Sequence, residues 1–212
     1  MFKYCIFSLL LLFTLSSCNN SKREKNQPVK KVNQKIIIDC NYSFKEAIAG
    51  SMAPKSVIKE LELITVLYYS IDGKIHSGQL LLNKKIAKDA KYIFNFMLKV
   101  HFPIAKVIPV VKYNWNDNLS MLDNNSYSFC YRNIGYSKHA YGMALDINPY
   151  FNPVRWKEGY KNRQNVPKGA TYNTSVNGTF YPTHIVVKEF RKLGFRWGHT
   201  FTRNFDDHHF EK

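Results

Sequence analysis

Apolar residues in the middle of the chain follow first a strand pattern and then a helix pattern. Residues 61–71 form a β-prone run, and Asp72-Gly73 after it is a hairpin turn signal, so 74–82 is predicted to return as a second strand. Asn83 then stands where a helix N-cap is expected. Apolar residues next recur at helical spacing up to about Val100, namely Ile86, Ala90, Ile93, Phe94, Met97 and Leu98. The pattern therefore predicts a hairpin and a helix that share one core.

Shorter patterns fill the second half of the chain. Residues 104–111 predict another apolar strand, and 126–132 alternate in a way that predicts a strand ending at Arg132. The stretch 151–179 predicts a long loop in the wall of a cleft. A helix is expected from Pro182 to Lys192, with Gly194 ending it and 195–197 entering the last strands.

The first 17 residues have the pattern of a signal peptide. Lys3 precedes an apolar run over 5–15, which is shorter than the about 20 residues that a membrane-spanning helix needs. Leu15-Ser16-Ser17-Cys18 matches the lipobox of bacterial lipoprotein signals, so Cys18 is the expected lipidation site; an ordinary signal peptide with an incidental cysteine is the alternative. Residues 18–35 then form the lipidated cysteine and a flexible basic tether, and 36–212 form the domain.

The charge of the chain bears on its partners. The formal net charge is +16 at pH 7, and loss of the signal with its single lysine leaves +15. An exported protein this basic favours wall polymers, peptidoglycan carboxylates or lipid headgroups, although a merely soluble lysine-rich surface has the same composition. Nucleic acid is not expected as a partner, because the sequence contains no known nucleic-acid-binding module and the signal exports the chain.

His139 and Asp146 are the first candidates for metal chemistry. Seven residues span about 23 Å on a straight strand and about 10 Å on a helix, whereas zinc ligands each lie about 2 Å from the ion. A shared metal therefore requires a bend, which Gly142 permits. A capping aspartate and an unrelated histidine are the alternative. Asp146 projects from the strand face that lacks bulk, opposite the apolar residues Met143, Leu145 and Ile147.

The segment 204–212 supplies further ligand candidates, because it contains a second histidine beside carboxylates. Two histidines and one aspartate leave one tetrahedral position open, as a catalytic zinc needs in order to hold a water. A further carboxylate near that water can take its proton. Histidine and aspartate sets also bind iron or manganese, so the residues alone leave the metal open.

These two segments together resemble the zinc D-alanyl-D-alanine peptidase family, which includes VanY-type carboxypeptidases, VanX-type dipeptidases and phage L-alanyl-D-glutamate endopeptidases. The family pattern Ser-x-His-x-x-Gly-x-Ala-x-Asp is matched at every fixed position from Ser137 to Asp146. An acidic residue three before a histidine follows, at Asp206 and His209. The resemblance covers about residues 60 to 212 and includes Asp117-Asn118-Leu119-Ser120-Met121, Asn124-Asn125, Tyr131-Arg132, Asn148-Pro149, Asn152-Pro153 and Gly194-Phe195-Arg196-Trp197-Gly198.

The resemblance implies one Zn²⁺ ion held by His139, Asp146 and His209. His209 is chosen over its neighbour His208 because it keeps the His-Phe-Glu register, and adjacent strand residues face opposite ways. Glu211 lies on the same side of that strand as His209 and is expected to orient an imidazole from outside the ligand set.

The same resemblance assigns the catalytic groups. Asp206 is expected as general base, chosen over Asp207 for the same register. Arg132 is expected to contact the substrate and to stabilise negative charge at the scissile carbonyl; a surface arginine paired with an acid is the alternative.

Substrate contacts are assigned to Ser137, Tyr141 and Trp197, although core burial is an equal alternative for the tryptophan. His199 departs from the family pattern, because a second glycine is expected after Gly198. This departure leaves the local shape of the pocket open and could place an extra imidazole near the cleft.

The resemblance implies a zinc metallopeptidase that acts on peptidoglycan stem peptides, with D-alanyl-D-alanine carboxypeptidase activity as the first choice. An L-alanyl-D-glutamate-type endopeptidase is the second choice. A non-catalytic wall-binding lipoprotein is the third, but it predicts a broken ligand set, and the ligand set is intact here. The expected location is the bacterial cell envelope, with the lipid anchor in a membrane.

The implied fold is α+β: a single compact domain with a central antiparallel sheet flanked by helices, as in zinc DD-peptidases and Hedgehog-like domains. The sequence leaves several points open. Cys40 and Cys130 could form a disulfide in an oxidising compartment, but their spacing cannot decide this. Which membrane carries the anchor, the oligomeric state and the physiological role are equally undetermined.

Overall fold

The computed structural model describes residues 35–133, 135–160 and 163–212. The chain divides into two units, 1–33 and 34–212, and the described residues belong to the second. The predicted signal peptide, Cys18 and nearly all of the predicted tether lie outside the described residues. Within the described part, each helix is too short or too polar to cross a membrane.

The predicted hairpin is the longest pair of strands in the fold. β2 (Leu61–Tyr69) pairs antiparallel with β3 (Ile75–Asn83), and the short β1 (Ile37–Ile38) adds to β3 in parallel, giving the strand order β1-β3-β2. The turn at Asp72-Gly73 joins β2 to β3, and the N–H of Ser70 bonds the carbonyl of Lys74 across it at 2.8 Å. The hairpin predicted from the sequence is therefore confirmed here.

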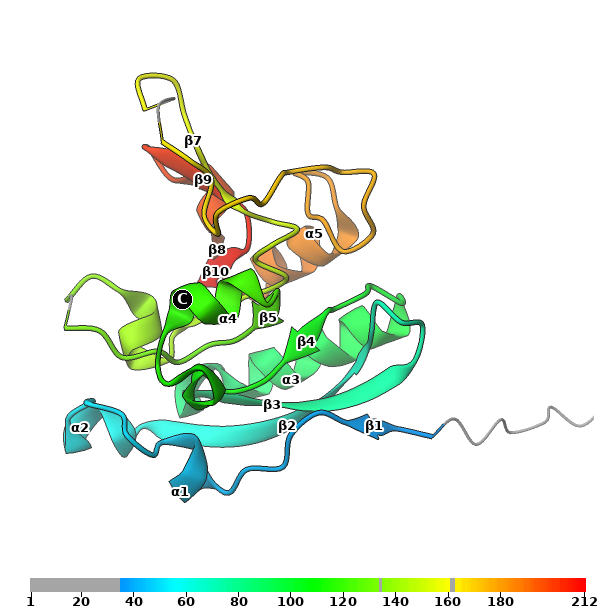
Figure 1. Ribbon diagram of the computed structural model, residues 1–212. Coiled ribbons are helices and arrows are strands. Elements are labelled where there is room, and N and C mark those ends of the chain that lie inside the picture. Colours follow the sequence, from blue (N-terminus) through cyan, green and yellow to red (C-terminus); the bar gives the residue numbers. More distant parts are fainter. Residues whose placement is uncertain (1–34, 134, 161–162) are drawn as a thin grey trace, which may run out of the picture. The chain divides into compact units, whose positions relative to one another are not determined.

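Helix α3 (Lys84–Lys99) covers one face of this sheet, while α1 (Phe44–Ala47) and α2 (Lys55–Ile58) lie against the other (Figure 1). The predicted N-cap is confirmed, since Oδ1 of Asn83 accepts from the N–H of Lys85 at 3.0 Å. The α3 face buries the apolar side chains Ile64, Val66, Leu80, Leu82, Ile86, Ile93, Phe94 and Met97.

A second sheet carries the C-terminal half of the domain. Its strand order is β6-β10-β8, with β6 (Ala144–Asp146), β8 (Arg196–Trp197) and β10 (His209–Glu211) all antiparallel to their neighbours. Helix α5 (Ile185–Lys192) packs on this sheet, and its Phe190 ring stacks on Phe210 at 3.8 Å. Leu145, Ile147 and Phe210 join the main core, so both sheets share one interior.

Short elements complete the domain. β4 (Lys106–Val107) pairs parallel with β5 (Asn125–Ser126), and β7 (Val154–Trp156) pairs antiparallel with β9 (Asn204–Asp206). One further short helix is α4 (Asp117–Leu122), and the 3₁₀ turns are η1 (Val110–Tyr113), η2 (Lys138–Tyr141) and η3 (Gly198–Thr200).

The structure supports the α+β class but not the single central antiparallel sheet. The described residues form two three-stranded sheets and two two-stranded sheets instead. One of the three-stranded sheets is mixed, because β1 pairs parallel with β3. The strand predicted over 104–111 is also wrong in its length, because only β4, at Lys106–Val107, forms there. Pro109 cannot donate to a ladder, and the chain turns into η1 directly after it.

Two further boundaries differ from the prediction. The predicted strand over 126–132 does not continue beyond β5. Residues 127–130 bond to different segments there: the N–H of Phe129 donates to Leu81, and the N–H of Cys130 donates to His139. Helix α5 begins at Ile185 rather than at Pro182, because Nδ1 of His184 accepts from the N–H of Val186 and caps the helix there.

Candidate metal centre

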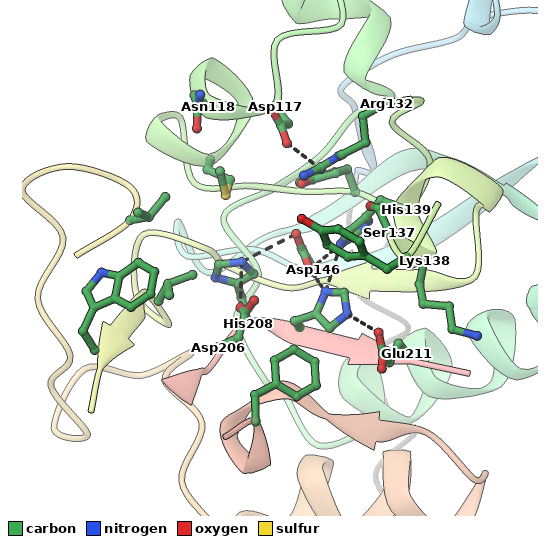
Figure 2. A pocket seen from close by; sticks show the side chains of 18 residues that line it. Asp117, Asn118, Arg132, Ser137, Lys138, His139, Asp146, Asp206, His208 and Glu211 are labelled. Atoms are coloured by element: carbon green, nitrogen blue, oxygen red, sulfur yellow. Dashed lines mark hydrogen bonds and ion pairs between the residues drawn. The ribbon is translucent and has the colours of Figure 1, made fainter. Parts of the chain in front are cut away.

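The main cleft of the domain has a volume of about 390 Å³ and lies where β6, β9 and β10 meet η2 and α4. Figure 2 shows His139 and His208 turned toward Asp146, while Asp117 on α4 points to Arg132. A volume of this size is ordinary for a ligand-binding pocket. The cleft is lined by the three predicted metal ligands, by Asp206 and Arg132, and by Ser137.

Sheet register places two of the predicted ligands side by side. In the antiparallel pair β6–β10, Asp146 stands directly opposite His209. Directly opposite residues have their Cβ atoms about 5 Å apart, so their side chains can meet on one face of the sheet. Asp146 and His209 are 63 positions apart in the sequence, yet Oδ1 of Asp146 lies 3.0 Å from Nδ1 of His209.

The bend required between His139 and Asp146 is present. His139 lies in the 3₁₀ turn η2, and Gly142 ends this turn with φ +67° before β6 starts at Ala144. A side chain at Gly142 would also collide with the hairpin, because an added Cβ would lie 2.7 Å from the N atom of Asn83. The family motif therefore needs glycine here for two reasons, a left-handed backbone and a close approach.

The three predicted ligands form a compact, buried triangle. His139 Nε2, His209 Nδ1 and Asp146 Oδ1 are each 3.0 Å from one another, and all three residues are at least nine-tenths buried. They are the one group of this kind among the described residues that could hold a metal ion.

Neighbouring acceptors fix which ring nitrogens face inward. Nδ1 of His139 lies 2.6 Å from the carbonyl oxygen of Ser128, and Nε2 of His209 lies 3.0 Å from Oε2 of Glu211. Both neighbours only accept, so these two nitrogens carry the protons. When both rings are neutral, Nε2 of His139 and Nδ1 of His209 carry the lone pairs. These lone pairs point toward each other and toward Oδ1 of Asp146. Such an electron-rich triangle is a fit for a metal cation.

The electrostatics of the triangle also favour a cation. Burial would raise the pKa of Asp146, but the charges of His139 and His208 and hydrogen bonds from His139 and His209 hold it well below its usual range. Burial would lower the pKa of His209, but the hydrogen bonds with Asp146 and Glu211 and the charges of Asp146 and Asp206 raise it to about 10. The carboxylates of Asp146 and Glu211 thus favour positive charge where the three ligand atoms meet, and that charge is a proton on His209 when no metal cation is bound.

Asp206, the predicted general base, ends β9 and lines the cleft next to the triangle. Its Oδ1 is buried without a well-oriented hydrogen bond, although it lies 3.1 Å from Nε2 of His208. Nδ1 of His208 lies 2.7 Å from the carbonyl oxygen of Asn152, and its Nε2 is 3.6 Å from Oδ2 of Asp146. The imidazole of His208 therefore stands between the predicted base and the metal centre.

Glu211 and Arg132 take the predicted places but have partners of their own. Glu211 contacts His209 as expected and also pairs with Arg196 at 2.9 Å. Arg132 lines the cleft, and its guanidinium pairs with Oδ2 of Asp117 at 2.5 Å. Burial would lower the pKa of Arg132, but Tyr127 and Asp117 among others raise it, so the side chain stays charged.

Two predicted substrate contacts do not line the cleft. Trp197 is 1% exposed in the core, where its Nε1–H donates to the carbonyl of Asp207, so the burial alternative is correct. Tyr141 lies on η2 with its side chain outside the cleft lining, and 42% of it is exposed. Ser137 does line the cleft.

His199 does not supply an extra imidazole to the cleft. Its ring stacks on Trp197 at 4.3 Å, and its Nδ1 lies 2.6 Å from Oδ1 of the fully buried Asp207. Arg155 donates to the other oxygen of Asp207 at 2.6 Å. Asp207 therefore holds His199 and Arg155 in place and does not line the cleft. This is consistent with the choice of Asp206 as the residue that faces the cleft.

Three further residues were named from the sequence without a role in the site. His208 and Asp117 contact the predicted base and the predicted arginine, respectively. Gly198 allows η3 to lie close to the site, since an added Cβ would lie 2.7 Å from the carbonyl oxygen of Asp206. Strand alternation set His208 aside as facing away from the metal, but His208 lies in the turn between β9 and β10, where strand alternation does not apply.

Comparison with known proteins adds one finding. A family profile described as D-alanyl-D-alanine carboxypeptidase matches residues 132–212, which contain every predicted metal ligand and the predicted base. No curated protein and no solved structure matches the chain. At a coarse level, the profile match supports a peptidase of the zinc DD-peptidase family, and the His-Asp-His group is one that could bind the metal such peptidases require.

Proposed function

We propose that this protein is a zinc-dependent D-alanyl-D-alanine carboxypeptidase that trims peptidoglycan stem peptides. The observation that carries the proposal is the mutual 3.0 Å approach of His139 Nε2, His209 Nδ1 and Asp146 Oδ1 in a cleft that also contains Asp206. The profile match to residues 132–212 supports the same substrate class.

A zinc ion held by these three residues would polarise the scissile carbonyl and lower the pKa of a water. Asp206 would take the proton of the attacking water and return it to the amine leaving group. His208 would hold the Asp206 carboxylate in place. Arg132 would stabilise negative charge as it develops on the carbonyl oxygen, because a guanidinium fork suits an oxyanion or a carboxylate.

An endopeptidase that cleaves within the stem peptide is the second candidate. The Arg132–Asp117 pair favours it, because Asp117 neutralises part of the charge that would otherwise attract a terminal carboxylate. Lys138 also lines the cleft and remains available as a second cation. The two candidates share one metal centre and differ only in which bond is placed there.

The test is the incubation of the purified protein with defined stem peptides, with and without a chelator, and the identification of products by mass. Loss of one terminal D-Ala supports the carboxypeptidase proposal, and internal fragments support the endopeptidase. His209→Ala should abolish either product. His76→Ala is the matched histidine control, because His76 lies on β3, outside the cleft lining, and should leave cleavage unchanged. A protein that binds zinc but cleaves neither bond would contradict the proposal and favour a wall-binding role.

We further propose that the protein acts in the cell envelope as a lipoprotein. The support is the lipobox Leu15-Ser16-Ser17-Cys18 and the basic segment after it. Metabolic labelling with a fatty-acid analogue tests this proposal. Wild-type protein should be labelled and found with membranes, whereas Cys18→Ser should remain unlabelled.

A further inference from the structure

A second cleft, of about 320 Å³, lies at the start of helix α5 and shares no lining residue with the metal-centre cleft. We call it the α5 cleft. Its walls come from residues 100–103 directly after α3, from residues 174–179 and from residues 181–185, and its lining contains no acidic side chain. Its polar groups include hydroxyl, amide and imidazole groups, all of which can donate hydrogen bonds.

Thr179 gives the first sign that this cleft has a ligand. Its side chain is 3% exposed, and Oγ1 is buried without a hydrogen-bond partner among the described residues. Buried hydroxyl groups are nearly always bonded. Neighbouring backbone groups are bonded: the N–H of Thr179 donates to Val176, and the carbonyl of Gly178 accepts from the amides of Asn148 and Asn152. The unpartnered hydroxyl is thus a local feature of the cleft wall rather than a sign of loose packing.

His184 supplies a second donor from the same cleft. Its Nδ1 accepts from the N–H of Val186, so the proton of the neutral ring is on Nε2, and no partner for Nε2 is found in the described part of the chain. Burial lowers the pKa of His184, which keeps the ring neutral. Edge contacts to Phe102, Phe180 and Tyr181, with centroids 4.9 to 5.8 Å away, fix the plane of the ring.

The helix itself adds a favourable field. His184 is the N-cap of α5 and Ile185 is its first residue, and both line the cleft. The N-terminal end of a helix carries partial positive charge and unpaired N–H groups, which favour an anion. Around this polar floor, the rim is apolar, with Val100, Val176, Tyr181 and Ile185 between 37% and 53% exposed.

We propose that the α5 cleft binds a small oxyanion, a carboxylate or a phosphate, through the Thr179 hydroxyl, the His184 Nε2–H and the N-terminal end of α5. The oxyanion is held by donors at the floor, and an apolar group attached to it lies against the rim. Both a free anion and an anionic lipid headgroup have this chemistry. The site is independent of the proposed peptidase reaction, since the two clefts have separate linings.

The test uses the full-length protein and isothermal titration with inorganic phosphate and with acetate, at an ionic strength held constant with chloride. Wild-type protein should bind at least one of the two anions saturably. Thr179→Val keeps the shape of the side chain and should weaken binding by at least about tenfold, because a hydrogen bond to a charged group is lost. Thr179→Ser keeps the hydroxyl and is the matched control. His184→Asn retains an N-cap but removes Nε2–H, and it should also weaken binding.

Further variants and vesicle binding test whether the anion binds at this cleft and where the anion comes from. His209→Ala should bind the anion as wild type does, which separates this site from the metal centre. Without anion, Thr179→Val should unfold at a temperature no lower than wild type, because the replaced hydroxyl has no partner. Vesicles with phosphatidic acid, compared with vesicles of phosphatidylcholine alone, identify a headgroup as the source if Thr179→Val reduces the difference. Absence of saturable anion binding, or equal binding by wild type and Thr179→Val, would overturn the proposal.

Discussion

Nε2 of His208 lies 3.1 Å from Oδ1 of Asp206, and no hydrogen bond to that buried oxygen is found among the described residues. The imidazole is held from behind by the carbonyl of Asn152. The proposed general base therefore has His208, two positions along the chain, as a close neighbour in the cleft.

Replacement of His208 should slow catalysis without removing the metal ligands. We expect His208→Ala to lower kcat by about 10–100-fold, the range found when a residue that orients a metal site is lost. His208→Gln can still donate to Asp206 and should recover part of the rate. Steady-state kinetics together with zinc analysis provide the measurement. Unchanged kcat in His208→Ala would show that Asp206 needs no such support.

Replacement of Glu211 should weaken metal binding. Its Oε2 accepts from His209 Nε2 at 3.0 Å and thereby directs Nδ1 toward the metal centre. We expect Glu211→Gln to reduce zinc affinity by about 10–100-fold, measured by competition with a chelator. Arg196→Gln is the control. Arg196 pairs with the same carboxylate, but its side chain is 64% exposed, so its loss should have a much smaller effect.

Substitution of two glycines by alanine should distinguish the cost of backbone strain from the cost of a steric collision. Gly159 has φ +87° with nothing near an added Cβ, so Gly159→Ala should cost about 1–2 kcal/mol of unfolding free energy. Gly142 has φ +67° and also lies against the hairpin backbone, so Gly142→Ala should cost about 1–3 kcal/mol more. Urea unfolding monitored by circular dichroism measures both values. Equal losses would mean that the hairpin can move away from the added methyl group.

The contribution of His76 to stability should depend on pH. Burial would lower the pKa of His76, but hydrogen bonds and charges from Asp39 and Asp72 raise it above the unfolded value. A raised pKa stabilises the fold fully below the unfolded pKa of about 6.5, and this stabilisation is lost as pH rises through the folded pKa. We therefore expect wild type to exceed His76→Asn in unfolding free energy by more at pH 5.5 than at pH 9. A difference that is constant with pH, or that grows on raising it, would contradict this assignment.

Local patterns were sufficient to predict the hairpin and helix α3. The β-prone run over 61–71, the returning strand over 74–82, the turn at Asp72-Gly73 and the cap at Asn83 are each decided by neighbours in sequence. The other sheets could not be predicted in this way. β6, β8, β9 and β10 have two or three residues each, and their pairing is decided by segments far away in the chain.

The ligand set was predicted by the motif, and the structure brings His139, Asp146 and His209 together as the motif requires. Their role in binding zinc stays a prediction. The surroundings were less predictable, because they depend on tertiary packing. Trp197 was equally consistent with the core and with the cleft, and only the packing of η3 and β10 decides for the core. The pairing of Arg132 with Asp117 likewise depends on where α4 lies, which the sequence pattern does not determine.

Asn152 connects the two clefts of the domain. Its carbonyl oxygen accepts from His208, next to Asp206, while its side-chain amide donates to Gly178 and its Oδ1 accepts from Phe180, next to the α5 cleft. Binding equilibria are reciprocal: if an anion in one cleft changes the affinity of the other for its ligand, the second ligand changes anion affinity by the same factor. A single asparagine thus gives the fold a short route for thermodynamic coupling, and kinetics of stem-peptide cleavage would need to be compared at matched anion concentrations.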